Sequence, residues 1–225
     1  MTILLLLATF AVFLTIDYVR KEKTERVSQN AETTLEGTAA PPRMLPNYVS
    51  GFALPENYRY HPGHTWAMQE SPALVRVGLD DFAARLAGKI ESVHLPKRGQ
   101  WVRQGQKLAT IRREGQTAEL VSPVEGEVTN VNEALLTNPA LACSDPYGEG
   151  WLISVFSPDT PTNFRNLLGG ELARCWMAEA ASRLQAKFPV LAGAVAQDGG
   201  VAVQDLTAEL AGQEWNEVAG EFFLT

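Results

Sequence analysis

From Ile111 to Val128 the chain reads Ile-Arg-Arg-Glu-Gly-Gln-Thr-Ala-Glu-Leu-Val-Ser-Pro-Val-Glu-Gly-Glu-Val, a pattern typical of a β-hairpin with a further strand behind it. Two runs in which apolar and polar residues can alternate, 108–112 and 118–121, flank a polar tip. The residues of this tip are Arg113, Glu114, Gly115 and Gln116. Gly115 readily adopts the positive φ that a tight hairpin turn needs.

The strand expected after the hairpin has a near-repeat earlier in the chain. Residues 126–131 read Gly-Glu-Val-Thr-Asn-Val, and residues 88–93 read Gly-Lys-Ile-Glu-Ser-Val. Both follow the pattern Gly, charged, β-branched, polar, polar, Val. The echo favours two similar halves folded about the hairpin.

Several further motifs surround the hairpin, and together they carry a family resemblance. In chain order they are His64-Thr-Trp66, the stretches 77–88 and 93–99, Ser122-Pro-Val-Glu-Gly-Glu-Val128, 132–135, 138–141 and Asp145-Pro-Tyr-Gly-Glu-Gly-Trp-Leu152. This series, over roughly residues 58–188, resembles the H protein of the glycine cleavage system. The resemblance implies a mainly β fold with flanking helices (α+β), the barrel-sandwich hybrid of lipoyl-type domains.

In that family the hairpin tip carries a lysine that is acylated by lipoic acid. Counted back from Ser122-Pro123, the lysine position falls on Gly115, and a glutamate of the family three residues earlier falls on Arg112. Because glycine has no amine, no lipoyl amide can form there. We therefore expect a degenerate lipoyl position at Gly115 and no cofactor, although the family would imply lipoate.

Two other lysines are alternative acceptors for the lipoyl group. Lys107 precedes Gly115 by eight positions in the incoming strand, about 26 Å at roughly 3.3 Å per residue. Lys97 belongs to a different turn. Both are expected to be solvated surface charges.

Composition excludes some functions and leaves others open. The net charge of −7 and the pI near 5.1 argue against nucleic acid as a partner, since phosphate binding needs clustered Lys and Arg. His61 and His64 form an HxxH pair, but no Cys, Asp or Glu stands nearby at ligand spacing, so we expect a structural role and no metal. Cys143 and Cys175 form no CxxC pair and are expected to be buried free thiols.

The first 19 residues are predominantly apolar and approach the length that spans a bilayer. A cleaved signal peptide is the alternative, but no basic residue precedes the apolar run. We expect one transmembrane anchor at residues 1–19. The basic residues behind it, Arg20, Lys21, Lys23 and Arg26, would leave the globular part in the cytoplasm. Residues 20–46, rich in Glu, Thr, Ser, Ala and Pro, would form a flexible linker.

Residues 47–188 are expected to form the H-protein-like domain. Asp80 or Asp81 can cap a helix that ends at Gly88 and buries Phe82 and Leu86. A second helix is predicted from residue 163 to residue 188, with a buried apolar stripe of Leu172, Trp176, Ala180 and Leu184.

Residues 189–225 form a C-terminal extension beyond the resemblance. Two short helices are predicted, over residues 205–210 and 213–223. The second presents an apolar set of Trp215, Val218, Phe222 and Phe223, which can either dock on the domain or bind a partner.

Three functional hypotheses follow. The first is a non-lipoylated H-like module, tethered to the membrane through residues 1–19, that acts as a binding or scaffold subunit for an unknown protein partner. The second is a glycine cleavage H protein that carries lipoyl and aminomethyl groups on an unexpected lysine. The third, an enzyme, ranks last because we find no nucleophile–base pair or metal cluster in the sequence.

Overall fold

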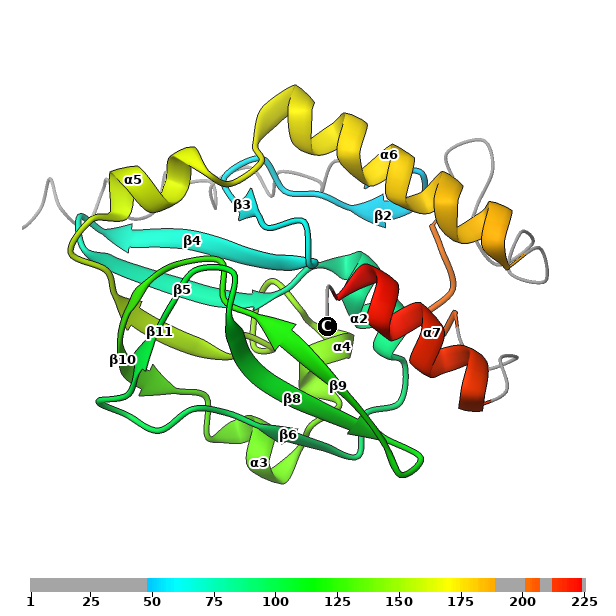
Figure 1. Ribbon diagram of the computed structural model, residues 1–225, viewed down its shortest axis with the longest axis horizontal. Helices are drawn as coiled ribbons and strands as arrows, with labels where there is room; N and C mark the ends of the chain where they lie inside the picture. Colours follow the sequence, from blue (N-terminus) through cyan, green and yellow to red (C-terminus); the bar gives the residue numbers. More distant parts are fainter. Residues whose placement is uncertain (1–47, 189–200, 207–211, 224–225) are drawn as a thin grey trace, which may run out of the picture. The chain divides into compact units, whose positions relative to one another are not determined.

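The predicted hairpin is present in the computed structural model, which describes residues 48–188, 201–206 and 212–223 (Figure 1). Strands β8 (Lys107–Arg113) and β9 (Gln116–Val121) are joined by a two-residue turn, Glu114-Gly115, with φ of 49° and 78°. Two positive φ values match the right-handed twist of the flanking strands. Strand β6 (Ser92–His94) pairs with β8, so the order in this three-stranded sheet is β6-β8-β9.

A second sheet faces the hairpin and supplies the other wall of the core. Its order is β3-β4-β5-β11-β10-β7, with antiparallel pairing throughout. The strands are β3 (Arg59–Tyr60), β4 (Thr65–Ser71), β5 (Leu74–Leu79), β7 (Trp101–Val102), β10 (Gly126–Val131) and β11 (Ile153–Phe156). Strands β1 (Tyr48–Val49) and β2 (Phe52–Ala53) form a separate pair. The mainly β class with flanking helices is confirmed.

The sequence echo does not correspond to two equivalent strands. Residues 126–131 form β10 as expected, but Gly88 ends a helix with φ 62°, and only Ser92–His94 is strand in the earlier copy. Moreover, β6 and β10 belong to different sheets. A six-residue pattern does not determine the local structure, because its glycine ends a helix in one copy and begins a strand in the other.

The first predicted helix is confirmed with its caps. Helix α2 (Asp81–Ala87) begins after Asp80, whose carboxylate accepts the Ala83 N–H at 2.7 Å. Phe82 and Leu86 are fully buried. The N-terminal cap satisfies one of the free N–H groups that every helix start leaves.

The predicted helix over residues 163–188 is in fact two helices. Helix α5 (Thr160–Arg165) and helix α6 (Gly170–Lys187) are separated at Leu168, whose backbone exchanges two hydrogen bonds with Tyr60. This bridge uses peptide groups that a continuous helix would need. The apolar stripe also differs, because Leu172 is 63% exposed and the buried residues of α6 are Ala173, Met177, Ala180, Ala181 and Leu184.

Two short helices, α3 (Ala134–Thr137) and α4 (Leu141–Ser144), precede β11. The expectation of two buried thiols is wrong for Cys175, which is exposed on α6, whereas Cys143 is partly buried. Burial raises the pKa of the Cys143 thiol to about 12.

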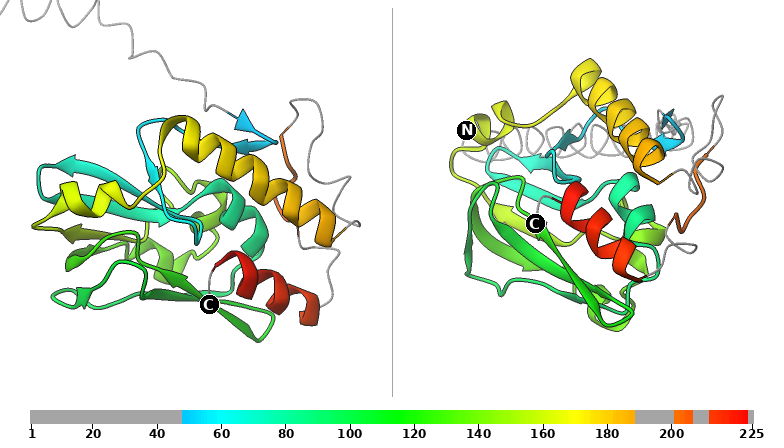
Figure 2. Two further views of the ribbon diagram at one scale, coloured as in Figure 1. Left: turned by 45° about the horizontal axis from the view of Figure 1, so that its top comes forward. Right: turned by 45° about the vertical axis from the view of Figure 1, so that its right-hand side comes forward.

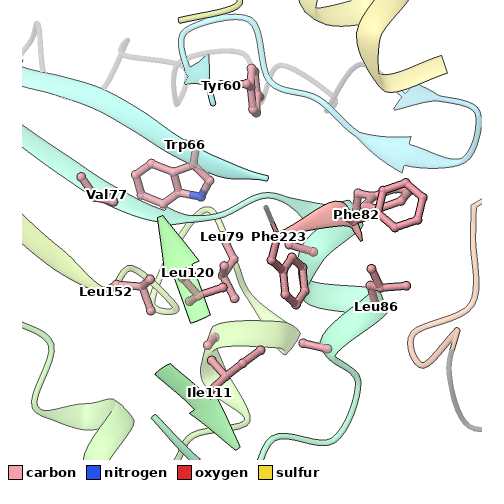
Figure 3. Close-up of a cluster of buried hydrophobic side chains, with 14 of the residues drawn as sticks. Tyr60, Trp66, Val77, Leu79, Phe82, Leu86, Ile111, Leu120, Leu152 and Phe223 are labelled. Atoms are coloured by element: carbon pink, nitrogen blue, oxygen red, sulfur yellow. The ribbon is translucent and has the colours of Figure 1, made fainter. Parts of the chain in front are cut away.

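The C-terminal helix α7 (Gly212–Phe222) docks on the domain. It contacts α2 and β9, and the views of Figures 1 and 2 agree that it lies beside both. All four apolar residues identified from the sequence, Trp215, Val218, Phe222 and Phe223, are buried. Figure 3 shows Phe223 among Leu79, Leu120 and Leu86, so the segment that contains α7 completes the main core.

Some predictions fall outside the described residues. The predicted anchor, residues 1–19, and the linker, residues 20–46, lie there, as does most of the predicted helix over 205–210; Asp205 and Leu206 are not helical. Within the described ranges, none of the helices combines the length and apolarity needed to cross a bilayer.

Trp215→Ala should lower the free energy of unfolding of the full chain by about 3–5 kcal/mol, because it empties a buried ring site. Trp215→Phe should cost less, about 1–3 kcal/mol, through loss of the indole N–H that donates to the Leu86 carbonyl. Leu172→Ala, at an exposed site, should stay within about 0.5 kcal/mol. Urea unfolding measures all three, and a Trp215→Ala variant as stable as Leu172→Ala would contradict the docking of α7.

Candidate functional site at the hairpin tip

The turn between β8 and β9 projects away from the core. Gly115 is exposed, and a Cβ placed on it would have no atom within 4 Å. Glu114 is also exposed, with 68% of its side chain accessible. A longer side chain at position 115 would therefore extend into open space. This is the geometry that a displayed side chain at the tip requires.

Arg113 belongs to the polar tip predicted from the sequence, but its side chain is buried. Side chains alternate along a strand, so Arg113 shares the inward face of β8 with Ile111. Its guanidinium Nη1 donates to the Ala87 carbonyl and to Asp205 Oδ1, both at 3.2 Å. The base of the tip is thereby fixed to α2 and to the C-terminal extension.

The last turn of α2 is the point where these elements meet. A helix leaves its final carbonyls without partners inside the helix. Here Arg85 O accepts the Leu206 N–H at 3.1 Å, Leu86 O accepts the Trp215 indole N–H at 3.1 Å, and Ala87 O accepts from Arg113. Three consecutive carbonyls thus hold the extension, α7 and the hairpin. The Arg113 charge is also favourable at the negative end of the helix dipole.

Gly88, directly after these carbonyls, has no space for a side chain. Its φ is +62°, and a Cβ built there would overlap Arg113 Nη1 and Asp205 Oδ1. The glycine therefore lets the ion pair between Arg113 and Asp205 approach the backbone. Larger residues would have to displace the charged groups.

Arg112, Lys107 and Lys97 lie on the surface. Arg112 is exposed, and its carbonyl accepts the Glu91 N–H on the side of β6. Lys107 begins β8, at the opposite end from the turn, and forms an ion pair with Glu119. Lys97 is exposed in the loop between β6 and β7. No lysine is part of the turn itself.

The HxxH pair is held by local contacts. His64 is fully buried, with Nδ1 2.8 Å from Asp80 Oδ2, and its ring stacks on Phe82 at 4.2 Å between centroids. His61 Nδ1 accepts the Gly63 N–H at 3.0 Å, and burial lowers the pKa of His61. These contacts orient both rings within the fold. In the part of the chain that is described, no three His, Cys, Asp or Glu side chains are grouped as a metal site.

A groove beside the tip was not foreseen from the sequence. It has a volume of about 460 Å³ and lies between the start of β9 and α7. Gly115, Gln116, Thr117 and Ala118 line one side, and Asn216, Ala219 and Gly220 line the other. Its two walls are about a hundred residues apart in the chain. Only the packing of α7 brings them together, so no local signal could reveal the groove.

Comparison with known proteins identifies the domain that bears this hairpin. The family model described as glycine cleavage H-protein matches residues 58–179, more than half of the 225 residues. The chain belongs to the glycine cleavage H-protein family. The match includes the hairpin and α2, and it ends before the extension that contains α7.

Two curated relatives agree with this assignment. A probable glycine cleavage system H protein of Aeropyrum pernix is 38% identical over 120 residues, which cover 53% of this chain and 82% of the relative. The glycine cleavage system H protein of Prochlorococcus marinus is 32% identical over 53% of this chain and 92% of its own. The crystal structure of a glycine cleavage system H protein from Mycobacterium marinum aligns with a TM-score of 0.46 and 29% identity. The alignment covers 52% of this chain and 94% of that one.

Two glycines of this site allow a matched test. Gly88→Ala should lower the free energy of unfolding by more than about 3 kcal/mol, because a Cβ overlap with Arg113 and Asp205 adds to the backbone strain. Gly115→Ala also places alanine at positive φ, but in open space, and should cost about 1–2 kcal/mol. Thermal unfolding of both variants measures the difference between these two losses of stability. Equal losses would show that Arg113 and Asp205 do not pack against Gly88.

Proposed function

We propose that this chain is a glycine-cleavage-H-like module without a lipoyl group at its hairpin tip, which serves as a non-enzymatic binding or scaffold subunit. The observation that carries the proposal is the turn itself. It consists of Glu114 and Gly115, and neither side chain offers an amine. The open space around Gly115 supports a tip that kept the shape of a display site while losing the acceptor.

The surroundings of the other lysines support the same proposal. Lys107 is at the far end of β8 with its charge paired to Glu119, and Lys97 belongs to a separate loop. Arg112 takes the place where the family resemblance puts a glutamate. A ligase that recognises a lysine at the turn would find neither the amine at position 115 nor the glutamate at position 112.

The proposal includes a place for the module at the membrane. Residues 1–19 would form a single-pass anchor and residues 20–46 a linker, with the domain on the cytoplasmic side. The partner would be a protein within reach of that linker. A coil of 27 residues has a root-mean-square span of roughly 30 Å, which would hold the module close to the membrane surface.

A second candidate is a carrier of lipoyl and aminomethyl groups in glycine decarboxylation. The names of the relatives favour this candidate, since the curated proteins similar to this chain are glycine cleavage system H proteins. It would require an acceptor lysine elsewhere than the tip. The chemistry at Gly115 is our reason for placing it second.

The purified full chain, produced together with lipoate and a competent ligase, is expected to carry no lipoyl adduct. Intact-mass spectrometry and an anti-lipoyl blot measure this directly. A stoichiometric adduct on Lys97, Lys107 or another lysine would overturn the scaffold proposal and establish the carrier.

Gly115→Lys serves as the positive control for that experiment. The side chain would enter open space at the turn, so some lipoylation should appear, and adding Arg112→Glu should raise it. Lys107→Arg in the same background should leave the signal unchanged. An unmodified double variant would show that the tip differs from its relatives in shape as well as chemistry.

The membrane location is tested separately. The full chain should sediment with membranes and resist extraction by carbonate, while a variant that begins at residue 20 should be released. Protease added outside intact cells should not cleave the domain. Release of the full chain by carbonate would exclude a spanning anchor, and cleavage from outside would reverse the orientation.

A further inference from the structure

We draw no further inference here: the strongest candidate, the outer face of the six-stranded sheet where the half-exposed rings of Trp101 and Phe156 flank Glu127 on neighbouring strands, carries none because nothing in the structure shows what covers it.

Discussion

Three consecutive carbonyls at the end of α2 join parts of the chain that the sequence keeps far apart. Arg85, Leu86 and Ala87 accept hydrogen bonds from Leu206, Trp215 and Arg113. Helix ends usually find such partners in water or in the next turn of chain. Here the partners are the C-terminal extension and the hairpin, so the tip, the extension and the core share one junction. Gly88 completes it by leaving space for Arg113 and Asp205.

That junction explains how the domain combines a family fold with its own addition. The matched region, residues 58–179, supplies the three-stranded sheet, the six-stranded sheet and α2. The helix α7 lies outside the matched range, yet its Trp215 and Phe222 are as well buried as the core of the family domain. By packing against β9, α7 turns one flank of an exposed hairpin into an interior surface. What remains open is the turn and the groove beside it.

The sequence predicted features whose signals are local. The hairpin followed from alternation around Gly115, and α2 followed from Asp80 and Gly88 at its two ends. The apolar set of α7 was recognisable, although its docking was one of two options. The break before α6, the burial of Arg113 and the exposure of Cys175 depend on contacts with distant residues, such as Leu168 with Tyr60 and Arg113 with Asp205. The groove belongs to the same group, since α7 forms one of its walls.

The bond between Trp215 and the Leu86 carbonyl also has a consequence for the order of folding. The two residues are 129 positions apart, and Phe223, just after α7, also packs into the main core. Contacts of such long range slow folding, because a large loop must close before they form. During synthesis, α2 and the hairpin emerge long before the helix that completes them. The core of the nascent domain therefore stays incomplete until α7 has been synthesised and can pack against α2 and β9.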